Sequence, residues 1–140
     1  MGLPGSGKTW LAERLQKHLD CAWFNADEVR RMANDWEFGE EARIRRARRM
    51  CNLANYEKGC GRTVICDFVC PTEHAREEFA PDFTVWMDTI KEGRFEDTNQ
   101  MYVPLERGQY DYHVSKWFND TDKQLVEVVS KYMKRNNASN

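Results

Sequence analysis

The chain has 140 residues, of which 41% are hydrophobic and 31% are charged, and its formal net charge is −2. This length and composition predict one globular domain with a single core and exclude a disordered chain. The small negative charge argues against strong sequence-independent binding to nucleic acid, although a local basic patch is compatible with it. The sequence has no run of 18 apolar residues and no recognisable signal peptide. We therefore expect no membrane partner and a cytoplasmic location.

The chain has five cysteines, an odd number, and no two of them form a C-x-x-C pair. Such a set is a poor basis for a disulfide framework or a thiolate metal site. We expect the thiols to be reduced and buried, as in a cytosolic protein.

The first residues match the phosphate-binding pattern G-x-x-x-x-G-K-[ST] without a mismatch. Glycines let consecutive backbone N–H groups surround a phosphate, and the helix that follows adds the positive end of its dipole. The lysine would reach the β- and γ-phosphates of a nucleotide, and the threonine hydroxyl would hold Mg²⁺. The alternative is a glycine-rich turn that matches by chance. The predicted nucleotide-binding residues are Gly2, Leu3, Pro4, Gly5, Ser6, Gly7, Lys8 and Thr9.

A loop of this kind normally follows a buried central strand, but only Met1 precedes it in this sequence. A parallel sheet without that strand would have a gap in its middle. We therefore expect the first strand to be missing from the chain, with a different strand filling the space as the alternative.

Apolar runs of strand length alternate with helical patterns along the rest of the chain. This alternation predicts a three-layer α/β domain with a parallel sheet and right-handed crossovers. We expect one domain over residues 1–135, a disordered polar tail over 136–140, and a functional loop without periodicity between Thr89 and Gln109. The expected strands are 21–25, 63–69, 83–88 and 111–114, and the expected helices are 10–19, from 27, 40–58, 72–79 and from 121.

Three carboxylates follow predicted strands, and ligands bind at the carboxyl ends of parallel strands. Asp27 could accept a proton from a substrate hydroxyl or organise Mg²⁺ through water, although an N-cap of the next helix is the alternative. Asp67 ends the clearest strand and could serve as a base or bind water on Mg²⁺, with a cap or turn role as the alternative. Asp88 has the same position on its own strand. The predicted catalytic residues are Lys8, Asp27 and Asp67. The predicted metal ligands are Thr9 and Asp67.

Five arginines fall within residues 43–49. A helical projection places Arg43 and Arg46 within or beside the apolar arc, where a buried guanidinium needs an anionic partner. We expect one of these two to contact an anionic ligand, with pairing to Glu40 or Glu41 as the alternative. The projection places the other three on the opposite, solvent-exposed side: Arg45, Arg48 and Arg49.

Three phenylalanines fall in predicted loops or strand ends near the same edge of the sheet, namely Phe38, Phe68 and Phe95. Aromatic rings in such places can stack on a flat base. Core packing is an equal alternative for Phe68.

Beyond the phosphate-binding loop, the chain resembles adenylylsulfate kinases, which phosphorylate the 3′-hydroxyl of adenosine 5′-phosphosulfate. The resemblance runs in order through residues 2–9, 25–30 (N-A-D-E-V-R, like D-G-D-N-V-R), 38–43 (F-G-E-E-A-R, like F-S-x-E-D-R), the arginine pair 48–49, and 67–71. It implies a P-loop kinase domain that uses ATP, with Asp27 as catalytic acid or base. It also implies that Arg30 and Arg43 bind the phosphosulfate or ribose, and that Phe38 and Phe68 hold the adenine.

The chain departs from the family pattern at three places. Asp67 stands where the family has serine, and Arg46 where it has asparagine. After Asp88 the chain skips a helical lid, although Phe95 fits the spacing of the family's later substrate loop. Residues 94–99 also resemble small phage-encoded proteins described as adenylylsulfate kinases by similarity, so a phage-encoded, lid-deleted member is one interpretation.

These observations favour an ATP- and Mg²⁺-dependent kinase with a small-molecule or nucleotide-like acceptor, adenosine 5′-phosphosulfate being the first candidate. The second hypothesis is a kinase acting on a nucleic-acid hydroxyl such as a hydroxymethylpyrimidine, which a basic strip of Arg45, Arg48 and Arg49 continuous with the site would favour. The third is a non-catalytic nucleotide-binding interaction module. The oligomeric state is left open, with a homodimer among the alternatives.

Overall fold

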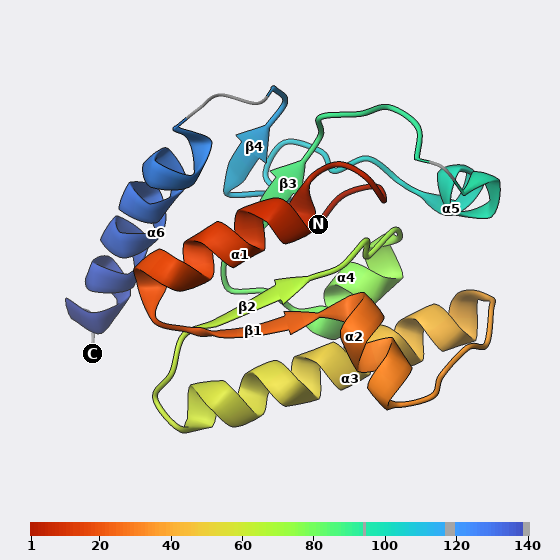
Figure 1. Cartoon of the computed structure of the whole chain (residues 1–140), viewed down its shortest axis with the longest axis horizontal. Helices are drawn as coiled ribbons and strands as arrows, with labels where there is room; N and C mark the ends of the chain where they lie inside the picture. Colours follow the sequence, from red (N-terminus) through yellow and green to blue (C-terminus); the bar gives the residue numbers. More distant parts are fainter. Residues whose placement is uncertain (94, 117–119, 139–140) are drawn as a thin grey trace.

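The computed structural model describes residues 1–93, 95–116 and 120–138, and each of its strands is followed along the chain by one or two helices (Figure 1). Both pairs of strands are parallel, which confirms the predicted α/β class. The strands are β1 (Ala22–Asn25), β2 (Val64–Asp67), β3 (Val85–Met87) and β4 (Tyr112–Val114). The helices are α1 (Lys8–Leu19), α2 (Ala26–Met32), α3 (Glu40–Gly59), α4 (Glu73–Phe79), α5 (Glu96–Met101) and α6 (Thr121–Ala138).

Helices cover both faces of the strands, which gives the expected three layers (Figure 1). Neighbouring strand residues point to opposite faces, and the two core clusters follow this rule. Ile65 packs against the cluster that contains Leu11 of α1 and Leu125 of α6. Cys66, the next residue, packs against the cluster that contains Met50 of α3. The α1–α6 pair and the α3–α4 pair therefore lie on opposite sides of the sheet.

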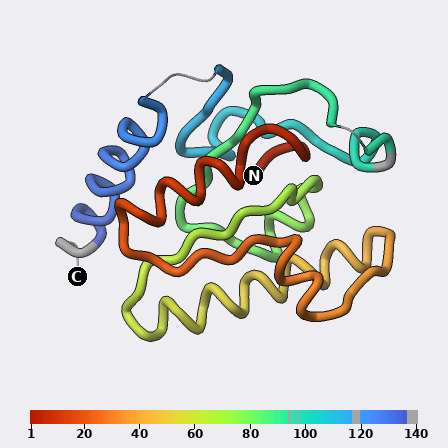
Figure 2. Tube along the Cα trace, viewed as in Figure 1, coloured from red at the N-terminus to blue at the C-terminus, as the bar shows by residue number. Residues whose placement is uncertain are grey.

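The described strands do not form one continuous sheet. β1 pairs with β2 and β3 pairs with β4, and the residues before α1 add only a bridge between Gly2 and Met87. The Met1 carbonyl accepts a hydrogen bond of 2.8 Å from the Met87 N–H. Figure 2 shows this first segment running between the two halves. The expected gap in the middle of the sheet is therefore confirmed for the part of the chain that the structure describes.

A cavity of about 340 Å³ lies between the two pairs of strands. Ile65 and Cys66 of β2 line one side and Val85 and Met87 of β3 line the other, with Leu11 of α1 among the helical residues at its wall. The lining is mostly apolar, as expected for the position of a central strand in a parallel sheet.

The structure corrects two expectations at the C-terminal half. The segment between Thr89 and Gln109 contains α5, a helix of 6 residues that is too short for a hydrophobic period to show in the sequence. Helix α6 extends to Ala138, so the tail expected from residue 136 continues the helix for three residues. A helix that has already formed propagates at low cost through weak helix formers such as Asn136. Residues 139–140 lie outside the described residues.

None of the helices that the structure describes contains a stretch both long and apolar enough to span a membrane.

The five cysteines are free thiols and differ in exposure. Burial raises the pKa of the Cys66 and Cys70 thiols to about 12, whereas Cys60 is exposed. At pH 8 a thiol with such a pKa is only about one part in ten thousand thiolate, which is the reactive form.

We expect a water-soluble disulfide reagent to modify Cys60 in the native protein, and Cys66 and Cys70 only after unfolding. Timed labelling followed by peptide mass spectrometry measures this, and equal labelling rates for Cys60 and Cys66 would contradict it.

Candidate active site

The phosphate-binding loop adopts the backbone conformation that its glycines predict. Gly5 has φ 86° and Gly7 has φ 97°, both in the left-handed region. Gly2 is required for a different reason, because a Cβ there would lie 2.5 Å from the Met87 carbonyl oxygen. The loop therefore packs against β3 and turns directly into α1, whose first N–H groups point back toward it.

The loop is held by hydrogen bonds to its own backbone carbonyls. The Lys8 ammonium donates to the Leu3 carbonyl over 3.0 Å, and the same oxygen accepts the Ser6 N–H over 3.1 Å. Thr89 fixes the other side of the loop by donating its hydroxyl to the Ser6 carbonyl over 2.7 Å. The conformation thus holds the lysine side chain over the loop, in reach of an anion bound there.

Three polar side chains from three elements meet beside this loop. The Thr9 hydroxyl, in the first turn of α1, donates to Oδ2 of Asp67 over 2.9 Å. The Asn25 side-chain amide donates to the same oxygen over 2.9 Å and approaches the Thr9 hydroxyl oxygen at 3.2 Å. Asn25 and Asp67 are the last paired residues of the parallel strands β1 and β2. The two predicted metal ligands are therefore in direct contact.

The structure assigns the cap of α2 to Asn25, not to Asp27. The Asn25 side-chain oxygen accepts the Glu28 N–H over 3.1 Å, which is the N-cap bond. Asp27 lies in the first turn of α2, where its side chain is exposed. The alternative of Asp27 as the N-cap of α2 is therefore wrong. Asp88, by contrast, is paired, since His113 lies 2.9 Å and Lys91 3.3 Å from its carboxylate.

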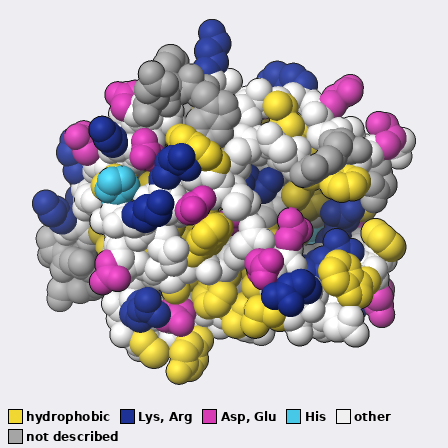
Figure 3. All heavy atoms as spheres, in the orientation of Figure 1, with side chains coloured by type: hydrophobic (Ala, Val, Ile, Leu, Met, Phe, Trp, Pro, Cys, Tyr) yellow, Lys and Arg dark blue, Asp and Glu magenta, His cyan; other side chains and the backbone are white. Residues whose placement is uncertain are grey.

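A group of arginines lies on α2 and the first turns of α3: Arg30, Arg43 and Arg46. Arg46 is half-buried, and burial together with the nearby charges of Arg30 and Arg43 lowers its pKa from the ordinary value. Its Nη2 donates to the Glu37 carbonyl oxygen, while its buried Nε has no hydrogen-bond partner within the described part of the chain. Dark-blue basic side chains and yellow hydrophobic ones gather on this side of the molecule in Figure 3.

The arginines expected to face solvent are paired instead. Arg45 and Arg49 both bond to the buried carboxylate of Asp35, and Arg48 bonds through two nitrogens to Glu78 of α4. The helical projection was right for Arg48, whose side chain is 61% exposed, and largely right for Arg45 at 43%, whereas Arg49 is only 29% exposed. Arg46 bonds to a loop carbonyl rather than to the glutamates at the start of α3.

The three candidate phenylalanines have different environments. Phe38 is 80% exposed, on the loop between α2 and α3. Phe95 is 52% exposed and directly precedes α5. Phe68 is only 7% exposed and packs edge-on against Phe79, with ring centroids 4.9 Å apart. The alternative of core packing is therefore confirmed for Phe68, because the chain after β2 turns it toward α3 and α4.

Sequence reasoning missed three residues of this region: Asn25, Asp35 and Trp36. Asn25 had a usable signal, since it ends a predicted strand and directly precedes a predicted helix start. Trp36 lies 53% exposed on the same loop as Phe38, with the Arg30 guanidinium 5.0 Å from its ring centroid. Asp35 had no local signal, because its partners lie on the next helix.

The chain is similar to known proteins in sequence and in fold. A curated probable adenylyl-sulfate kinase of Aeropyrum pernix is 36% identical over 84 residues, a match that covers 54% of this chain and 44% of that relative. The chain thus matches less than half the length of this curated relative.

Two solved structures share the fold. The APS kinase of Mycobacterium tuberculosis, determined in complex with AMPPNP and APS, has a TM-score of 0.68 at 16% identity, covering 93% of this chain and 94% of that one. A sugar kinase from Janibacter sp. HTCC2649 has a TM-score of 0.66 at 17% identity, covering 96% and 91%.

The family model for adenylylsulphate kinase matches residues 1–109, a stretch that contains the phosphate-binding loop, Asn25, Asp67 and the arginines of α2 and α3. The chain therefore belongs to the adenylylsulphate kinase family.

Proposed function

We propose that this chain transfers the γ-phosphoryl group of ATP, with Mg²⁺, to the hydroxyl of adenosine 5′-phosphosulfate. One observation carries the proposal. The phosphate-binding loop, with its Thr9–Asp67 pair, lies at the carboxyl ends of the parallel strands β1 and β2. The helices that follow β1 in the chain carry the arginine group of Arg30, Arg43 and Arg46. A donor phosphate and an anionic acceptor would therefore meet at a single edge. The Mycobacterium tuberculosis kinase of the same fold holds AMPPNP and APS.

The residues present fit a magnesium ion. The Thr9 hydroxyl and the Asp67 carboxylate are hard oxygen donors held 2.9 Å apart. Within the described residues no cluster of three or more His, Cys, Asp or Glu side chains could hold a metal alone. This suits Mg²⁺, which keeps several waters and takes few protein ligands beside the substrate phosphates. When bound, the ion would neutralise charge that develops on the phosphates.

The chain's own residues would divide the remaining work. Lys8 would exchange its bond to the Leu3 carbonyl for the β- and γ-phosphates, at small cost because one hydrogen bond replaces another. Oδ2 of Asp67 already accepts two hydrogen bonds. Asp27 is therefore the better candidate to accept the proton of the acceptor hydroxyl. Catalysis would consist mainly of positioning and electrostatic stabilisation.

The arginine group would recognise the acceptor. Burial and, after it, the like charges of Arg30 and Arg43 lower the pKa of Arg46, an unfavourable arrangement that an anion in their midst would relieve. The exposed Phe38 ring, whose centroid lies 5.7 Å from the Arg30 guanidinium carbon, offers a face on which a purine could stack. Arg43 lies half-buried in the first turn of α3. A nucleotide with a phosphosulfate group has both features, an anion and a flat base.

The structure gives less support to a nucleic-acid acceptor. The strip that would favour it is paired with three carboxylates: Arg45 and Arg49 bind Asp35, Arg45 also binds Glu37, and Arg48 binds Glu78. Transfer from labelled ATP to adenosine 5′-phosphosulfate, nucleosides, and DNA with and without hydroxymethylpyrimidine separates these hypotheses. Labelling of modified DNA alone would replace our acceptor. Nucleotide binding with no transfer to any of them would favour a non-catalytic module.

Replacing Lys8 tests the catalytic role of the loop. We expect Lys8→Ala to lower kcat about 100-fold or more, because it removes a positive charge from the transferring phosphoryl group. Lys17→Ala is the matched control, since Lys17 is an exposed lysine of the same helix. Initial rates of ADP release with adenosine 5′-phosphosulfate present measure both variants. Equal activity of Lys8→Ala and wild type would contradict the catalytic role of Lys8.

Replacing the two carboxylates separates their roles. We expect Asp67→Asn to weaken Mg²⁺-dependent ATP binding by about tenfold or more, the loss typical of a disturbed metal shell. We expect Asp27→Asn to keep that affinity and to lower kcat by about 100-fold, as when a general base is lost. Calorimetric ATP titrations with and without Mg²⁺, together with steady-state rates, measure the two effects. The reverse pattern would exchange the two assignments.

A further inference from the structure

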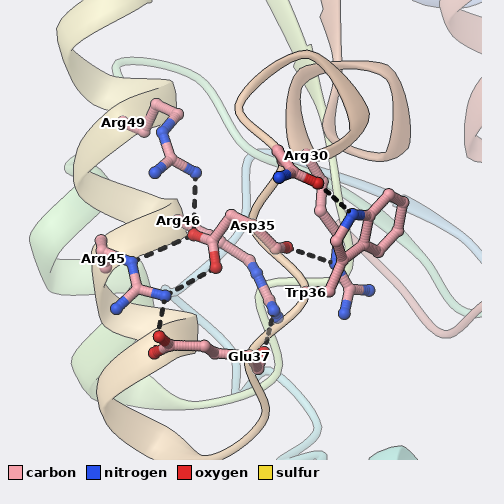
Figure 4. Close-up of polar contacts among 8 residues, drawn as sticks. Arg30, Asp35, Trp36, Glu37, Arg45, Arg46 and Arg49 are labelled. Carbon is pink, nitrogen blue, oxygen red and sulfur yellow. Dashed lines mark hydrogen bonds and ion pairs between the residues drawn. The ribbon is translucent and has the colours of Figure 1, made fainter.

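Asp35 is a buried acid in the loop between α2 and α3, with 7% of its surface exposed. Its carboxylate bonds to two arginines of α3: Arg45 donates through Nε and Nη2 over 3.0 and 2.6 Å, and Arg49 donates through Nη1 over 3.0 Å. These bonds hold the pKa of Asp35 well below its ordinary range, and the bond from Arg45 contributes most to this. The loop is thus attached to α3 by a two-sided, charge-assisted contact (Figure 4).

The backbone of the same residue holds Arg30. The Asp35 carbonyl accepts the Arg30 Nε–H over 2.9 Å, and the Asp35 N–H donates to the Arg30 carbonyl over 3.1 Å. The Arg30 guanidinium then lies 5.0 Å from the Trp36 ring centroid and 5.7 Å from that of Phe38. One residue therefore connects the side chain of Arg30 to the position of α3.

We propose that Asp35 is a positioning residue for the acceptor site: through its carboxylate it fixes the α2–α3 loop to α3, and through its carbonyl it orients Arg30 beneath Trp36 and Phe38. Asp35 touches neither substrate in this scheme. The contacts of Asp35 are needed because Trp36 and Phe38 of the same loop are exposed. The loop by itself therefore makes few buried contacts that could fix the Arg30 guanidinium.

The inference rests on the proposed function for what the site binds, and it has a readout that does not. Asp35→Asn keeps the side-chain shape and the backbone carbonyl but removes the charge that binds Arg45 and Arg49. We expect this variant to raise amide hydrogen exchange across residues 33–39. We also expect it to raise the KM for adenosine 5′-phosphosulfate by about tenfold, the cost of a misplaced binding group, with the KM for ATP unchanged.

Glu78→Gln is the matched control. Glu78 accepts two hydrogen bonds from Arg48 of the same helix, over 2.9 and 3.1 Å, but it belongs to α4 and not to the loop. A general loss of α3 ion pairing would affect both variants alike. We expect Glu78→Gln to leave both the exchange of residues 33–39 and the acceptor KM unchanged.

Arg45→Gln provides a second route if Asp35→Asn does not fold, because it removes the two-nitrogen contact with Asp35 and the bond to Glu37 of the same loop, and keeps the bond from Arg49. Faster exchange in residues 33–39 with either variant, and not with the control, supports the positioning role. Unchanged exchange, or an equal rise in the KM values of ATP and acceptor, overturns it. Absence of phosphoryl transfer by the wild type refutes the proposed function, and amide exchange alone then decides the role of Asp35.

Discussion

The contact of Thr9, Asn25 and Asp67 is the constraint on which the rest of the site depends. It joins the first turn of α1 to the ends of β1 and β2 through one shared carboxylate oxygen, with both donors at 2.9 Å. The parallel register places Asn25 opposite Asp67. The same asparagine caps α2 through its side-chain oxygen. The start of α2, and with it the position of Asp27 and Arg30, is therefore set by the cluster that also positions the phosphate-binding loop.

The parts of the site that the sequence predicted are those that local patterns encode. The loop glycines, Lys8 and Thr9 follow from backbone requirements, and Asp67 follows from its place at the end of an apolar strand. Asp35 could not be found in this way, since its partners lie 10 and 14 residues further along the chain. A helical projection assigned those arginines to solvent because it includes no neighbouring segment. Tertiary contact, not helical period, decides their environment.

The same distinction explains the errors in the fold. Helix α5 has only 6 residues, too few for a hydrophobic period, and the side chain of its Asn99 bonds to both backbone groups of Gly93, six residues earlier. The gap between β2 and β3 was foreseen because a buried central strand is a requirement of the layer architecture. Apolar walls on both sides of the 340 Å³ cavity agree with that requirement. The requirements of the layer architecture thus predicted the gap in the sheet, whereas local sequence patterns did not predict α5.

Charge near α2 and α3 supplies the strongest physical reason to expect an anionic acceptor. The buried acid of this region, Asp35, carries one negative charge and already binds two guanidinium groups. Arg30 is held through a neutral carbonyl, and Arg46 bonds to another carbonyl and has a lowered pKa. These two bonds satisfy donors of Arg30 and Arg46 without cancelling the charges of their guanidinium groups. Arg46 stands where the resembling kinases have asparagine, and the added charge makes an anion more favourable here than in a site with the neutral amide.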